Sequence, residues 1–280
     1  MRDVRPVVDC HAHIIDPARF PFDDGPGYMP KVHETGPREA YAGVLDDHDV
    51  RHALLVQPSC YGFDNSAMLD AVARDPARYK AIAMVDPGIG EPELSDLAHR
   101  GVVGVRFNLV SYDRAALSRP DVPAFLARLR ARGWFAEVMA DDTQWPAIAD
   151  VLLQSGVHIL VDHFGISDVA GGIDRPGFSA VLALGRARRA VVKITTPFVF
   201  HDGPLPTEHL TPVVTALVGA FGIERCVWGS DWPFLGVAAR PDYSEVREIL
   251  PHWVSDSASC RRILWDNPVR LFGFGARGHG

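Results

Sequence analysis

The alternation of strand-like and helix-like segments constrains the fold of this 280-residue chain more than any other feature. Short apolar stretches rich in β-branched residues are each followed by a polar or Gly/Pro loop, and then by a segment with helical spacing of its apolar positions. The predicted strands are Pro6–Cys10, His52–Gln57, Lys80–Val85, Val102–Asn108, Trp134–Met139, Val157–His163, Val191–Thr195 and Cys226–Ser230. The predicted helices are Arg38–Asp47, Asn65–Arg74, Glu91–His99, Val122–Arg132, Gln144–Leu153, Phe178–Arg188, Glu208–Phe221, Tyr243–Leu250 and Ser257–Leu264.

This alternation is typical of α/β proteins whose parallel strands are joined by right-handed crossovers. The series of strand–helix units favours a closed (β/α)8 TIM barrel, and an open doubly wound sheet is the runner-up. No linker rich in Gly, Ser or Pro and no low-complexity tract marks a boundary, so residues 1–280 are predicted to form a single domain. The longest irregular segment, Ile14–Pro37, follows the first strand, and we predict that it forms a lid or a wall of a binding site.

Charge and cysteine content exclude several classes of protein. The net charge is −7, so no global positive field is available to attract nucleic acid or an anionic membrane surface. No apolar run is long enough to span a bilayer, and no signal-peptide core precedes the first strand, so we expect a cytoplasmic protein. A small molecule is the expected partner, and the sequence leaves open whether the chain forms a homo-oligomer. Without a C-x-x-C pair, the cysteines are expected to be reduced thiols, namely Cys10, Cys60, Cys226 and Cys260.

Histidines and one aspartate follow three of the predicted strands at the end where barrel enzymes carry their functional groups. His11 and His13 end the first strand, and alternate residues of a strand face the same side, so their imidazoles are predicted to converge. His163 ends the sixth strand. Asp231 follows the eighth strand, which lies beside the first when a barrel closes. A lone histidine is more often a packed polar group, but the shared position of these four predicts one site.

Three imidazoles and one carboxylate suit two kinds of water activation. His11, His13, His163 and Asp231 could hold a single divalent ion such as Zn²⁺ or Mn²⁺, which would lower the pKa of a bound water. Without a metal, Asp231 could accept a proton from water while the imidazoles polarise a carbonyl oxygen. The residues alone do not choose between these two mechanisms.

Arg106 ends the fourth strand, where its guanidinium could bind a substrate carboxylate or form a salt bridge with Glu137. Glu137 itself lies among apolar neighbours, so pairing with Arg106 or Lys193 is an alternative to a catalytic role. Asp9 and Asp162 are predicted to orient neighbouring residues, because histidines in such sites need a second hydrogen-bond acceptor behind them. Further substrate contacts are predicted at the ends of the second and fourth strands, from Gln57, Ser59, Tyr61 and Asn108.

Several ordered motifs resemble the amidohydrolase superfamily, and more narrowly its lactonase branch, which includes 2-pyrone-4,6-dicarboxylate lactonase and sugar-lactone hydrolases. The resemblance runs from about Val7 to Gly273. It implies a distorted (β/α)8 barrel that hydrolyses a cyclic ester, with Asp231 as the base that activates water, three histidines polarising the carbonyl, and Arg106 binding a carboxylate or ring oxygen. The motifs are Val8–His13, Gly104–Asn108, Val161–Gly165, Trp228–Pro233 and Asp266–Gly273.

Two departures from the family pattern modify this expectation. Typical amidohydrolases carry a histidine at the end of strand five, where this chain has Glu137, so a two-metal site is not expected. By resemblance the cofactor is none or one divalent ion, because the pyrone lactonase is regarded as metal-independent and other members hold one ion. That lactonase also surrounds its dicarboxylate with arginines, which are missing here at 165–168 and 196–199. We therefore expect a less anionic lactone or a monocarboxylate.

Two alternatives to a lactonase stay open from the sequence. One is a metal-dependent amidohydrolase or decarboxylase on the same barrel, and the missing strand-five histidine counts against it. The other is a non-catalytic barrel that binds a small acid. A binding site has no need of a water-activating base, so Asp231 argues against that alternative.

Overall fold

A single sheet of parallel strands in the order β1 to β8 forms the centre of the computed structural model, which describes residues 6–165, 172–195 and 207–275. A bridge between Ala12 and Trp232 joins the first strand to the segment after the last, so the sheet is nearly closed. The predicted (β/α)8 barrel is confirmed. The strands are β1 Val7–Ala12, β2 Val50–Val56, β3 Tyr79–Ala83, β4 Val102–Asn108, β5 Phe135–Met139, β6 His158–Val161, β7 Ala190–Ile194 and β8 Cys226–Trp228.

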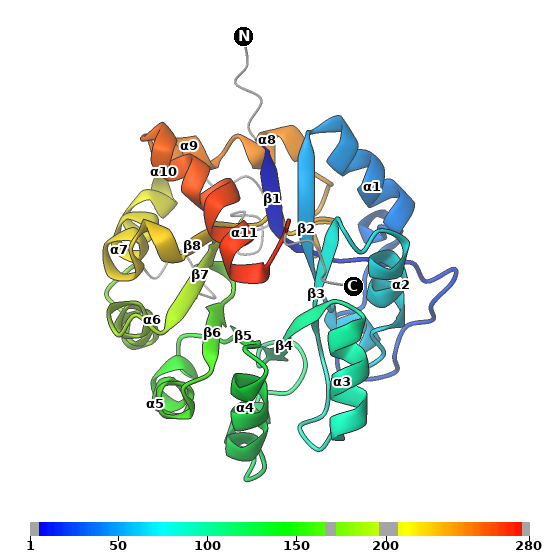
Figure 1. Ribbon diagram of the computed structural model, residues 1–280. Coiled ribbons are helices and arrows are strands. Elements are labelled where there is room, and N and C mark those ends of the chain that lie inside the picture. The colour runs from blue at the N-terminus through cyan, green and yellow to red at the C-terminus, as the bar shows by residue number, and fades with distance from the viewer. Residues whose placement is uncertain (1–5, 166–171, 196–206, 276–280) are drawn as a thin grey trace.

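Helices surround these strands on the outside (Figure 1). Each outer helix buries one apolar stripe, as in α5, where Trp145, Ile148, Ala149 and Leu152 recur at the helical spacing and are buried. No helix of the described residues is both long and apolar enough to cross a membrane. The helices are α1 Arg38–Asp47, α2 Ser66–Arg74, α3 Glu91–His99, α4 Val122–Ala131, α5 Trp145–Ser155, α6 Pro176–Arg186, α7 Thr211–Phe221, α8 Tyr243–Arg247, α9 Leu250–Trp253, α10 Ser257–Arg261 and α11 Asn267–Phe272.

The C-terminal helices differ from the prediction. The predicted helix Tyr243–Leu250 ends early, at Arg247, and α9 starts a new turn with Pro251 in its first turn, where a missing N–H costs nothing. The predicted helix Ser257–Leu264 is α10 followed by a π-helical stretch from Arg262 to Asp266. The helix α11 has no counterpart among the predicted helices, because its six residues are too short for a periodic pattern to be recognised.

The interior of the barrel contains an apolar layer and a polar layer. The apolar layer is one buried cluster that includes Val8, Leu54, Phe135 and Val191 from four different strands. Helix α11 covers this end of the barrel (Figure 1). The ring of its Phe272 is centred 5.2 Å from that of Phe135. Because apolar side chains close that end, the polar interior side chains lie toward the carboxyl ends of the strands.

Candidate active site

The four residues predicted to form the site lie together at the carboxyl ends of the strands. The Nε2 atoms of His11 and His13 are 3.3 Å apart. An Oδ1 atom of Asp231 lies 3.4 Å from Nε2 of His11 and 3.5 Å from Nε2 of His13. The ring of His163 is centred 4.6 Å from that of His11. All four residues are buried, so only small parts of their side chains are exposed to solvent.

An irregularity in β1 helps to place the first two imidazoles. Val8 and Cys10 belong to the apolar interior cluster, so regular alternation would direct His11 to the other face of the sheet. The pairing register with β2 shifts between Asp9 and Ala12, and His11 also reaches the interior, where it contacts Lys193 of β7. The convergence of His11 and His13 was therefore predicted correctly, but it depends on a local irregularity in addition to alternation.

Asp231 is held in an unusual backbone conformation. Its φ is 65°, in the left-handed region that costs a non-glycine residue roughly 1–3 kcal/mol. Its N–H donates to the carbonyl of His11 at 2.8 Å, which ties the segment after β8 to β1. The preceding residue, Ser230, donates its N–H and its hydroxyl to the buried carboxylate of Asp9. Asp9 thus orients its neighbours as predicted, through the backbone N–H of His11 and through Ser230, the residue before Asp231.

Four buried charged side chains form a layer beneath the imidazoles. Lys193 Nζ lies 2.5 Å from Oε2 of Glu137 and 3.1 Å from Oδ1 of Asp162. Arg106 Nε lies 3.3 Å from Oδ2 of Asp162 and 3.6 Å from Oε1 of Glu137. Both predicted pairings of Glu137 are therefore present. Asp162 also lies beside His11, with Oδ1 3.2 Å from Nδ1, which is the proximity that its predicted orienting role requires.

The protonation of these groups follows from burial and from their neighbours. Burial raises the pKa of Glu137 to about 8, and nearby Asp162 adds to the effect against the opposing cations. For Asp162, burial is outweighed by Lys193 and His11, so its pKa lies well below the usual range. Burial and Lys193 together lower the pKa of His11 well below its usual value. For Asp231, the neighbouring imidazoles outweigh burial and lower the pKa to about 2, so it is anionic near neutral pH.

A cavity of about 270 Å³ opens onto this cluster. The predicted contacts Ser59, Arg106 and Asn108 border it, as do His13, His163 and Asp231. Sequence reasoning missed Tyr28, which also borders the cavity and whose hydroxyl donates to the buried carboxylate of Glu34. The signal was indirect, because Tyr28 belongs to the irregular segment predicted to form a wall. The other lining residues are Pro58, Val110, Ser111, Met139, Leu235 and Gly236.

Two of the predicted contacts have other partners. Gln57 donates its amide to the carbonyls of Gly62 and Asp64. The hydroxyl of Tyr61 accepts the N–H of Asp16. Neither side chain is among the described residues that border the cavity. Their hydrogen bonds fix the loop after β2, a connection whose side-chain directions a strand pattern does not specify.

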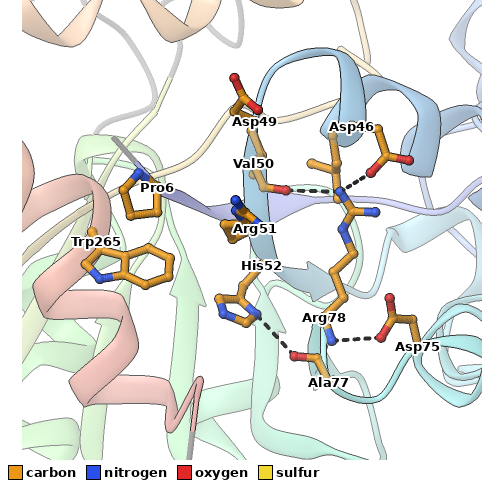
Figure 2. A pocket seen from close by; sticks show the side chains of 11 residues that line it. Pro6, Asp46, Asp49, Val50, Arg51, His52, Asp75, Ala77, Arg78 and Trp265 are labelled. Carbon is orange, nitrogen blue, oxygen red and sulfur yellow. Dashed lines mark hydrogen bonds and ion pairs between the residues drawn. The ribbon is translucent and has the colours of Figure 1, made fainter. Parts of the chain in front are cut away.

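A larger cavity of about 740 Å³ lies at the start of β2 (Figure 2). Two of its polar side chains have partners within the cavity wall: Arg78 contacts the carboxylate of Asp46 and the backbone carbonyl of Val50, and His52 Nδ1 contacts the backbone carbonyl of Ala77. The ring of His52 also stacks near that of Trp265. None of the predicted site residues lines this cavity, so its size does not make it the candidate site.

Known proteins resemble this chain over nearly its whole length. It is 29% identical to 4-sulfomuconolactone hydrolase of Hydrogenophaga intermedia, over 96% of this chain and 89% of that protein. It is 28% identical to 2-pyrone-4,6-dicarboxylate hydrolase of Comamonas testosteroni, over 95% and 89%. A solved structure from Acinetobacter baumannii, described as a probable 2-pyrone-4,6-dicarboxylic acid hydrolase with citric acid bound, superposes with a TM-score of 0.85 at 28% identity, over 96% of this chain and 99% of that one.

The family model of the amidohydrolases matches residues 8–274, from the second residue of β1 to two residues beyond the end of α11. The matched range includes every strand of the barrel after Val7 and all four residues of the imidazole–carboxylate cluster. The chain therefore belongs to the amidohydrolase family.

Proposed function

We propose that this protein opens a lactone by hydrolysis, with Asp231 as the base that activates water. One observation carries the proposal: a buried, anionic carboxylate lies among three imidazoles at the edge of a cavity large enough for a small ring. The names of the similar hydrolases support it, since both act on lactones. The match to the amidohydrolase family supports a hydrolase.

The arrangement supports a reaction in two proton-coupled steps. A water beside Asp231 gives a proton to the carboxylate, and its oxygen attacks the lactone carbonyl carbon. Negative charge develops on the carbonyl oxygen, where the N–H groups of His11 and His163 stabilise it. The ring C–O bond then breaks, and the proton held by Asp231 passes to the leaving alkoxide, which leaves a hydroxy acid as the product.

The cavity favours a substrate with little negative charge. Arg106 is the one arginine or lysine among the described residues that border it. Its guanidinium is already bonded to Asp162, to the carbonyl of Gln57 and to the sulfur of Met139. The segments 166–171 and 196–206 contain no arginine or lysine and lie outside the described residues. A second substrate carboxylate would lack a cation and would be costly to desolvate, so we propose a neutral or singly charged lactone.

The donor atoms fit a single divalent ion by distance. His11, His13 and Asp231 form one group whose ligand atoms lie within 4.8 Å of one another, and His11, Asp162 and His163 form a second. A bound Zn²⁺ or Mn²⁺ would supply an acidified water. The hydrogen bonding does not fit as well, because Lys193 occupies Nδ1 of His11, the nitrogen nearest Asp162, and so favours a proton on Nε2, the nitrogen that faces His13 and Asp231. The steps above therefore use the side chains alone.

The exchange Asp231→Asn tests the proposed base. We expect kcat for lactone opening to fall by about 10²–10⁴-fold, with a much smaller change in substrate binding, because the amide cannot take the proton. Proton release should be followed with neutral, singly carboxylated and doubly carboxylated lactones, before and after treatment with a chelator. Asp47→Asn, an exposed position on α1, is the matched control and should leave kcat unchanged.

The same panel distinguishes the alternatives. Unchanged turnover in Asp231→Asn would reject this residue as the base. Efficient opening of dicarboxylated lactones above all others would reject the proposed substrate class. No turnover of any lactone, with Zn²⁺ or Mn²⁺ supplied, would reject lactone hydrolysis and favour an amidohydrolase or decarboxylase activity, which amide and aromatic acid substrates would then test.

A further inference from the structure

Lys193 lies directly behind one of the site imidazoles. Its side chain is fully buried, and its Nζ is 3.0 Å from Nδ1 of His11. An ammonium group has three donors and no acceptor, so Nδ1 accepts this bond and carries no proton. In a neutral imidazole the single ring proton then resides on Nε2, which faces His13 and Asp231.

The hydrogen bonds of His13 are consistent with this arrangement. Nδ1 of His13 lies 2.8 Å from the carbonyl oxygen of Val56, and a carbonyl only accepts, so the proton of His13 is on Nδ1. Its Nε2 then presents a lone pair, 3.3 Å from Nε2 of His11. One chain of bonds therefore runs in a single direction, from Lys193 through His11 and His13 to the backbone of β2, and each donor meets an acceptor.

Asp162 is the competing partner of His11. Its Oδ1 is 3.2 Å from Nδ1 of His11 and could accept a proton placed there. That oxygen has no partner in hydrogen-bond geometry among the described residues, whereas the contact between Lys193 and His11 does meet that geometry. The second acidic side chain near the ammonium, Glu137, accepts a hydrogen bond from Lys193 at 2.5 Å and keeps Nζ in place. The directions of the bonds thus favour Lys193 over Asp162 as the partner of Nδ1.

We infer that Lys193 is a positioning residue that holds the ring proton of His11 on Nε2. His11 then donates a hydrogen bond toward the carboxylate, the neighbouring imidazole or a substrate oxygen, and it lacks the lone pair that a metal ion would require. A hydrogen bond from Nε2 of His11 to a lactone oxygen rests on the proposed function. The position of the proton and the affinity for metal do not, so they are measured without substrate.

The wild-type chain provides the first test. Full-length protein labelled with ¹⁵N-histidine is studied by long-range ¹H–¹⁵N correlation near neutral pH, with His11→Gln to assign the signals of His11. We expect a protonated, pyrrole-type Nε2 and an unprotonated, pyridine-type Nδ1. The opposite pattern would overturn the inference, whether or not any variant folds.

The exchange Lys193→Met gives the second test, because methionine has a similar length and no donor. We expect the Nδ1-protonated form of His11 to become populated, with its proton directed at Asp162. Affinity for Zn²⁺ or Mn²⁺, measured by titration calorimetry with the metal alone, should rise by about 10–100-fold, the range typical of changes in the groups behind metal ligands. Lys80→Met on β3 is the matched control and should change neither readout.

Removal of one buried charge could also unfold the protein. The double variant Lys193→Met with Glu137→Gln removes both members of the 2.5 Å pair and is the alternative background for the same two measurements. An unchanged His11 spectrum and unchanged metal affinity in a folded variant would reject the role of Lys193. If the spectra agree with the inference while no lactone is opened, the proposed substrate is wrong and the role of Lys193 stands.

Discussion

At the scale of single residues, neighbours decide what each buried ionisable side chain does. Two carboxylates of the charged layer lie near the same cations, yet the pKa of Asp162 is well below its usual range and that of Glu137 is raised to about 8. Asp162 faces His11, Lys193 and Arg106 together, whereas Glu137 has the negative charge of Asp162 beside it. Residue type alone would have made both anionic at neutral pH.

The raised pKa of Glu137 predicts how stability depends on pH. Between its unfolded value near 4.5 and its folded value of about 8, the folded state holds a proton that the unfolded state has released, so stability falls as pH rises through this window. His11 and His163, whose folded pKa values are lowered, are neutral in both states above about pH 6.5. From about pH 6.5 to 8, the free energy of unfolding should fall by on the order of 1–2 kcal/mol.

Glu137→Gln removes this titrating group with little change of shape. Urea denaturation across the same pH range should show the decline in the wild type and a nearly constant free energy of unfolding in the variant. Glu245→Gln, at an exposed position of α8, is the control and should keep the decline. An equal decline in wild type and Glu137→Gln would assign the effect to another group.

At the scale of elements, the site depends on the close approach of β1 to the segment after β8. Gly229 lies at this contact, and a Cβ built there would be 2.6 Å from Cβ of His11 and 2.7 Å from its backbone nitrogen. Real side chains do not tolerate such distances, so any other residue would push the two segments apart. The N–H of Asp231 bonds the carbonyl of His11 across the same contact, so the imidazole and the carboxylate would separate together.

Gly229→Ala is therefore expected to destabilise the protein by about 1–3 kcal/mol, as overpacking does in a tight interior, and to lower lactone turnover in the fraction that stays folded. Gly219→Ala is the matched control, because this glycine is in helix α7 with nothing within 4 Å of a built Cβ. That exchange should be neutral or stabilise by up to about 1 kcal/mol. Chemical denaturation monitored by circular dichroism measures the free energy of unfolding of both variants. Equal stability of Gly229→Ala and Gly219→Ala would contradict a tight contact at Gly229.

At the scale of the whole molecule, the interior excludes solvent from residues on widely separated elements. The four cysteines form no disulfide and are buried, as expected for reduced thiols, and they lie in β1, in the loop after β2, in β8 and in α10. Burial raises the pKa of Cys10 well above its usual value and those of Cys60 and Cys226 to about 12. None of these three is then a reactive thiolate in the folded protein.

Thiol labelling should consequently report global unfolding. We expect reaction of native protein with a disulfide reagent such as Ellman's reagent to be slower than that of urea-unfolded protein by at least about a thousandfold, a ratio set by the stability of an ordinary domain. Mass spectrometry of partly labelled samples should find unlabelled and fully labelled molecules. One cysteine that reacts rapidly on its own would reveal local opening, with Cys60, near the cavity, as the informative position.

The sequence by itself determined the barrel and the four residues at its mouth. Strand and helix periodicities are local, since they repeat every two or about 3.6 residues. Eight consecutive strand–helix units favour a closed (β/α)8 barrel. The strand ends then placed His11, His13, His163 and Asp231 together, because all parallel strands end at the same rim. The short helix α11 and the split of α8 from α9 escaped this reasoning, since four to six residues carry too little periodic signal.

Only the tertiary structure decided how those residues are used. Lys193 and His11 are 182 positions apart in the chain, and their 3.0 Å contact depends on where β7 meets the shifted register of β1. Tyr28 borders the cavity, and the amide of Gln57 bonds the backbone of the loop after β2. Both contacts depend on the conformation of loops, which the strand and helix periodicities do not specify. The physical reason is that hydrogen bonds have direction and a range of about 3 Å, so proton positions and pKa values depend on contacts that form only when distant segments pack.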